Sequence, residues 1–149
     1  MRRAYTPWPL DKPDPGLRGA NRVWTPVLKV RVLGPSHRVS PSIPAVVDSG
    51  APYCLFRAEV ANYLKLPLKN GPEGGIGGII GGVREPVYFH QVNIVIEDNW
   101  TISVWAGFMR KLSVTAILGR AGFFDKFQVM FDHSQSPPEF EVTKIDLIS

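Results

Sequence analysis

The chain of 149 residues contains a single cysteine, Cys54, and no long apolar run. One cysteine excludes an internal disulfide framework and gives no indication of an oxidising compartment. No stretch reaches the roughly 18 consecutive apolar residues that a membrane span needs. The opening MRRAYTPWPL also lacks the apolar segment of a secretory signal. We therefore expect a cytoplasmic protein without a membrane partner.

The composition is that of a folded globular chain, with 44% hydrophobic and 20% charged residues. The length predicts one domain, large enough to bury a core without disulfide support. Glycine and proline, at 14 residues each, predict many turns and short strands.

The net charge of +4 is unevenly distributed along the chain. Residues 1–38 carry eight basic and two acidic side chains, and the remaining residues carry nine basic and eleven acidic ones. A basic arm can bind nucleic acid or an anionic surface. Here the charges are scattered among prolines rather than clustered, which favours a solvated leader. We expect no nucleic-acid partner.

The pattern of apolar residues predicts mostly strands. Residues 1–22 hold four prolines and no apolar periodicity, which predicts an irregular leader followed by one domain over 23–149. Alternation or short apolar runs predict strands at 27–33, 43–47, 87–96, 101–108, 114–118, 127–131 and 139–142. Helical spacing at 56–66, ended by Pro67, predicts the main helix, and residues 120–125 fit one or two further helical turns. The arrangement favours a small barrel or sandwich.

Three motifs follow one another in the chain. The apolar run 43–47 ends in Asp48-Ser49-Gly50-Ala51, a sequence that by itself is also a common turn. Seven of the twelve residues in 71–82 are glycine, which predicts a mobile loop or hairpin tip. The third motif is Ala116-Ile117-Leu118-Gly119-Arg120.

In their order, these motifs resemble those of the retropepsin-like aspartic proteases, over roughly residues 24–145. The resemblance implies an all-β closed barrel with one main helix, one short helix and a glycine-rich flap hairpin. It implies an aspartic endopeptidase that acts on polypeptides and needs no cofactor or metal. Paired carboxyls share one proton, so that one activates water while the other protonates the carbonyl. Because the chain has one such Asp motif, the pair requires a homodimer.

The resemblance also assigns roles to individual residues. Ser49 would hydrogen-bond across the carboxyl pair, Gly50 would allow close approach, and the flap would close over an extended peptide. The implied catalytic residues are Asp48, Ser49 and Gly50, and the implied substrate-binding residues are Ala51, Gly75, Ile76, Gly77, Gly78, Ile79 and Ile117. Pro52 stands where many members have Asp or Ser, so Arg120 must find another partner or lie in solvent. Cys54 stands where Ser or Thr is usual.

The same residues also allow other functions. A retropepsin-like module that dimerises or binds peptides without cutting them remains open. The glycine-rich segment lacks the Gly-Lys-Ser/Thr ending of a phosphate-binding loop. Cys54 has no histidine at a spacing that supports a nucleophile, which favours a buried, structural role. One cysteine and dispersed histidines do not form a zinc pattern.

Overall fold

The structure is a computed structural model that describes residues 1–74, 79–80 and 83–146, with the backbone alone at 79–80 and 83–84. The chain divides into two compact units. One comprises Leu28–Asp125, and the other comprises Met1–Val27 together with Lys126–Ser149.

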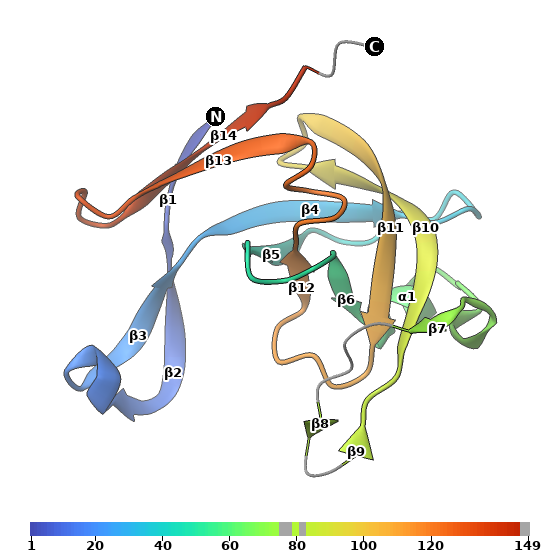
Figure 1. Cartoon of the computed structure of the whole chain (residues 1–149), viewed down its shortest axis with the longest axis horizontal. Coiled ribbons are helices and arrows are strands. Elements are labelled where there is room, and N and C mark those ends of the chain that lie inside the picture. Colours follow the sequence, from blue (N-terminus) through green and yellow to red (C-terminus); the bar gives the residue numbers. More distant parts are fainter. Residues whose placement is uncertain (75–78, 81–82, 147–149) are drawn as a thin grey trace. The chain divides into compact units, whose positions relative to one another are not determined.

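The larger unit is a closed β-barrel of six strands (Figure 1). The strands neighbour one another in the order β11-β6-β12-β5-β4-β10, and pairing of β10 with β11 closes the ring. Their bounds are β4 Val27–Leu33, β5 Ile43–Val47, β6 Leu55–Arg57, β10 Val87–Ile96, β11 Trp100–Met109 and β12 Ala116–Leu118. A closed ring leaves no open sheet edge among these strands. The predicted all-β barrel is confirmed.

Alternating side chains fill the barrel as the sequence pattern predicts. On β4, Leu28, Val30 and Val32 are buried while Lys29 is exposed. Buried positions again alternate over residues 91–96 of β10 and 100–106 of β11, with Ile94 and Val104 in the core. Burial of one face of each strand supplies the apolar free energy that holds the ring together.

The main helix is shorter than the sequence predicts. Helix α1 spans Ala58–Tyr63, whereas Leu55–Arg57 forms strand β6, paired with both β11 and β12. Phe56 is fully buried in that strand, so its place in the barrel overrides the helical spacing of 56–66. Lys65, with a φ of 57°, takes a left-handed conformation just after the helix, two residues before Pro67.

The second short helix expected at 120–125 is replaced by consecutive turns. The Gly119 carbonyl accepts hydrogen bonds from the Phe123 and Phe124 amides, at 3.3 and 3.2 Å. Gly122 has a φ of +104°, a conformation incompatible with a right-handed helix and readily adopted by glycine. The two short 3₁₀ helices lie elsewhere, at η1 Pro15–Leu17 and η2 Leu68–Asn70.

The segment expected to be the flap contains three short strands. They are β7 Glu73–Gly74, β8 Ile79–Ile80 and β9 Val83–Arg84. β7 pairs with the start of β10, and β8 pairs with β9 in antiparallel register. The predicted flap residues Gly75, Ile76, Gly77 and Gly78 lie outside the described residues.

The smaller unit corrects the expectation of an irregular leader. Its strands are β1 Arg2–Ala4, β2 Thr6–Asp14, β3 Ala20–Thr25, β13 Phe127–Asp132 and β14 Glu139–Lys144. β2 and β3 form a two-stranded hairpin, where the missing N–H groups of proline are tolerated because each strand has a free edge. The domain boundary at residue 22 stays a prediction.

Ion pairs attach the N-terminal strand to the C-terminal one. β1 pairs with β14 in a sheet of order β1-β14-β13. Arg2 contacts Glu141 at 2.9 Å and Glu139 at 3.2 Å, and the hydrogen bond to Glu141 is the main cause that raises the pKa of Arg2. Within the described ranges, no helix is long and apolar enough to span a membrane.

Candidate active site

Asp48 directly follows β5, at the point where this strand runs parallel to β12. Val47 lies opposite Leu118 in the pairing of β5 with β12. The Asp48 amide continues that pairing by donating to the Leu118 carbonyl at 3.0 Å. The first and third sequence motifs are therefore neighbours in the barrel, although about 70 residues separate them in the chain.

The Asp48 loop is a tight turn that holds its own carboxylate. The Gly50 amide donates to Oδ1 of Asp48 at 2.8 Å, and the Ala51 amide donates to the Asp48 carbonyl at 3.2 Å. Asp48, Ser49 and Gly50 are exposed, whereas Ala51 is buried. Within the described part of the chain, Gly50 is the one hydrogen-bond donor to this carboxylate. The carboxylate is fixed in place and open to solvent.

Gly119 allows the segment after β12 to pass close beneath the Asp48 loop. A Cβ at this position would stand 2.2 Å from the Tyr53 carbonyl oxygen and 2.9 Å from that of Ala51. The amides of Arg120 and Ala121 then donate to the carbonyls of Ala51 and Pro52, at 2.9 and 3.0 Å. These backbone bonds make the two loops one rigid platform.

The Arg120 side chain has found a partner other than the carboxylate that Pro52 replaces. Its Nη1 donates to the Ser49 carbonyl at 2.9 Å, across the outside of the loop. Arg120 remains exposed, so solvent also reaches the guanidinium. Arg120 therefore has a new partner, as expected, and this partner is the backbone carbonyl of Ser49 in the Asp48 motif.

Below the loop, small and apolar side chains fill the space. Leu118 and Cys54 are fully buried, and Ile117 is half-buried in β12 opposite Val46. The Cys54 thiol contacts the Ala121 carbonyl at 3.7 Å. This burial agrees with a structural role for Cys54 rather than a nucleophilic one.

Ile79 and His90 lie outside the Asp48 platform. Ile79 belongs to β8, and the structure describes only its backbone. His90, expected on a sheet face rather than in a metal site, forms a 2.8 Å hydrogen bond between its Nε2 and the Leu68 carbonyl. Across residues 1–74, 79–80 and 83–146, no three His, Cys, Asp or Glu side chains gather as a metal site would require.

Three aromatic side chains form a row that begins at the Asp48 loop and that the sequence pattern did not indicate. Tyr53 meets Phe89 edge to face at a centroid distance of 4.9 Å, and Phe89 stacks on Trp105 at 6.2 Å. Trp105 is 50% exposed. The register of β10 with β11, which pairs Phe89 with Gly107 and Gln91 with Trp105, places the last two rings side by side. That register could have been inferred from the turn at Asp98-Asn99.

Comparisons with known proteins concern the fold. No protein-family model and no curated protein matches the chain. The chain is similar to the retroviral protease-like domain of Ddi1 from Leishmania major, with 18% identity, a TM-score of 0.42, and coverage of 62% of this chain and 71% of that one. It is also similar to EIAV protease complexed with the inhibitor HBY-793, with 24% identity, a TM-score of 0.41, and coverage of 64% and 82%. Both structures are retropepsin-like, the class that the three motifs resemble.

Proposed function

We propose that the chain is an aspartic endopeptidase that works as a symmetric homodimer. The observation that carries the proposal is the exposed Asp48 carboxylate, fixed by the Gly50 amide in a loop bonded to the third motif. A carboxylate that only caps its own turn does not need a second loop bonded to that turn. Here the loop that begins at Gly119 packs so closely against the Asp48 loop that no side chain fits at Gly119. The platform instead holds an acid in one orientation, as catalysis requires.

The chemistry needs two such carboxyls, one from each subunit. At a separation of a few Å they cannot both ionise, so the pair shares one proton and titrates as a unit. The ionised carboxyl takes a proton from water, and the resulting hydroxide adds to the peptide carbonyl carbon. The protonated carboxyl gives its proton to the carbonyl oxygen. The first carboxyl then gives the proton that it took from water to the amide nitrogen as the C–N bond breaks. The second carboxyl takes a proton from a hydroxyl of the tetrahedral intermediate, which restores the shared proton.

The residues beside Asp48 take positioning roles in this proposal. The Ser49 hydroxyl bonds across the pair, and Gly50 leaves room for substrate. Ala51 and Ile117 line the floor beneath the peptide. A flap segment closes over an extended polypeptide and excludes bulk water, other than the reacting molecule, from the carboxyl pair. This segment contains Gly75, Ile76, Gly77, Gly78 and Ile79.

The experiment compares cleavage of a peptide library by wild-type protein, Asp48→Asn and Asp14→Asn, with and without a statine-type inhibitor. Asp14 is a matched control because its Oδ1 also accepts from the amide of a glycine two residues on, Gly16, at 2.7 Å. Asparagine keeps that acceptor, so both variants should fold. We expect Asp48→Asn to lose at least about 100-fold in cleavage and Asp14→Asn to retain it.

Two results would contradict the proposal. Equal cleavage by wild-type protein and Asp48→Asn would remove Asp48 from the chemistry. Binding of library peptides by the folded wild-type dimer with no inhibitor-sensitive cleavage would instead favour a peptide-binding module without proteolytic activity.

A further inference from the structure

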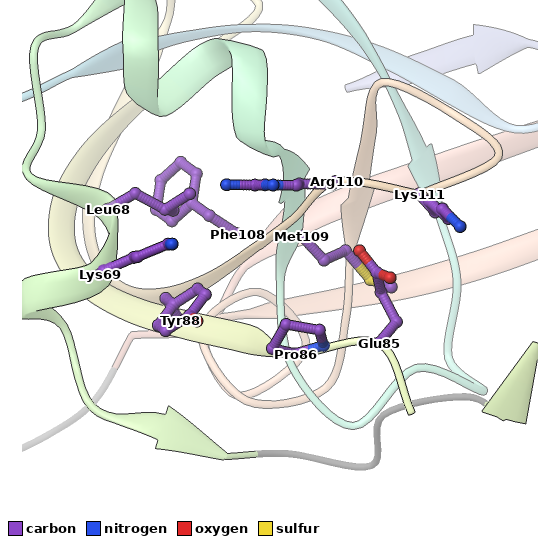
Figure 2. Close-up of a pocket in the computed structure, with 9 residues that line it drawn as sticks. All are labelled: Leu68, Lys69, Glu85, Pro86, Tyr88, Phe108, Met109, Arg110 and Lys111. Carbon is purple, nitrogen blue, oxygen red and sulfur yellow. The ribbon is translucent and has the colours of Figure 1, made fainter. Parts of the chain in front are cut away.

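A concave site lies in the barrel unit, lined by none of the residues proposed for catalysis. It encloses about 250 Å³, just below the roughly 300–1,000 Å³ of sites that hold drug-sized ligands (Figure 2). Its walls come from three separated segments: η2, the start of β10 with the residues before it, and the end of β11 with the turn that follows. A cavity of this volume suits a small molecule or one side chain.

Backbone contacts fix the wall formed by η2. The Leu68 carbonyl accepts from His90 at 2.8 Å, and the Phe89 amide donates to the Pro72 carbonyl at 3.1 Å. Gly71 lies so close to β10 that a Cβ there would stand 2.2 Å from the Phe89 carbonyl oxygen. The η2 wall is therefore fixed before any ligand arrives, which limits the entropy that this wall loses on binding.

The lining combines apolar surface with excess positive charge. Leu68, Tyr88 and Phe108 supply the apolar wall, and Phe108 is fully buried. Lys69, Arg110 and Lys111 supply cations, against one acid, Glu85.

Three cations of the lining have no ion-pair partner among the described residues. In the ranges that the structure describes, Lys69, Arg110 and Lys111 form no ion pair. In Figure 2 the nitrogen ends of Lys69 and Arg110 are directed toward the middle of the pocket, whereas that of Lys111 is directed away. The two inward cations and Glu85 leave a surplus of one positive charge.

We propose that this pocket binds a monocarboxylate with an aromatic or aliphatic body. One negative charge balances the surplus, and the planar Arg110 guanidinium matches a carboxylate with two parallel hydrogen bonds. A doubly charged phosphate would leave an excess of negative charge beside Glu85. The body of the ligand lies against Leu68 and Tyr88, which are half-buried, and the Tyr88 ring favours flat apolar groups. A free organic acid and an acidic side chain of a peptide share this chemistry.

The pocket adjoins the described strands that flank the glycine-rich residues. Glu85 and Pro86 follow β9 by one and two residues, and Tyr88 pairs with Glu73 of β7. The lining residues are therefore next to β9 in the chain and paired with β7, on either side of the glycine-rich residues.

The test follows backbone amide resonances of the full chain during titration with phenylacetate, phenylacetamide, and a short peptide with capped termini and one glutamate. We expect phenylacetate to shift amides in residues 68–69, 85–88 and 108–111 and the neutral amide to bind at least about tenfold more weakly. Arg110→Gln and Lys69→Gln should each weaken phenylacetate binding about tenfold, whereas Lys144→Gln, a change at an exposed lysine of β14, should not.

Each outcome decides the proposal. Equal binding of acid and amide, shifts confined to other residues, or unchanged affinity in both pocket variants would overturn it. Binding of the peptide in place of the free acid identifies a side chain as the source of the carboxylate. Titration of Asp48→Asn with the same probes separates this proposal from the catalytic one, because we expect that variant to bind phenylacetate as the wild-type protein does.

Discussion

Replacement of Gly119 by alanine should break the contact between the two loops of the proposed active site. The added methyl group would stand 2.2 Å from the Tyr53 carbonyl oxygen and 2.6 Å from its carbon. Both atoms belong to backbone, so no side-chain rotation relieves the overlap. The Asp48 loop must move away from β12, at the expense of the hydrogen bonds that Ala51 and Pro52 accept.

The expected cost combines overpacking with weakened backbone bonds. Overpacking alone costs about 1–3 kcal/mol, and two strained hydrogen bonds add about 1 kcal/mol. We therefore expect the free energy of unfolding to fall by about 3 kcal/mol. For a chain of this length, that fall lowers the melting temperature by about 6–12 °C.

Chemical denaturation and thermal unfolding measure this loss directly. Gly74→Ala is the matched control, because the nearest atom to a Cβ there is a Phe89 ring carbon at 4.0 Å. It should change the free energy of unfolding by less than about 0.5 kcal/mol. If Gly119→Ala unfolds within the same small margin, the close approach does not hold the loops together and the reasoning is wrong.

Three further predictions concern other contacts. Arg57→Gln removes the donors to the Leu112 and Ser113 carbonyls, at 2.9 and 3.1 Å, and should lower the free energy of unfolding by about 1–2 kcal/mol while speeding amide exchange in 110–115. Arg120→Gln should cost about 1 kcal/mol in urea unfolding, and Arg120→Lys less. Hydrogen bonds from the Ser134 side chain and amide lower the pKa of Asp132 below 3.8. That contribution to stability is present above the unfolded pKa and is lost as the pH falls through the folded one; Ser134→Ala should raise the Asp132 pKa in an NMR titration.

The barrel strands could be predicted because their signals are local. Residues 91–96 alternate between buried and less buried positions, and Glu97 and Asp98, at φ values of 51° and 53°, make the left-handed turn that leads into β11. The position of Asp48 at a strand end followed from the apolar run before it. These features need only a few neighbouring residues to form.

Features that depend on distant partners could not be predicted. The sequence of strand β1, Arg2–Ala4, carries no strand signal of its own. This segment is a strand because β14, from the other end of the chain, pairs with it. Phe56 has helical spacing, yet β11 and β12 draw it into a strand. The Arg120 contact with Ser49 and the cationic pocket likewise join segments that only the folded barrel brings together.

The most direct test of the central claim mixes wild-type protein with Asp48→Asn at fixed total concentration, after time for subunits to exchange. If each active site needs one Asp48 from each subunit, an equal mixture contains about one quarter wild-type dimers and should show about one quarter of the wild-type peptidase activity. Independent active sites, one in each chain, would instead leave about one half. That result would contradict a shared pair of carboxyls.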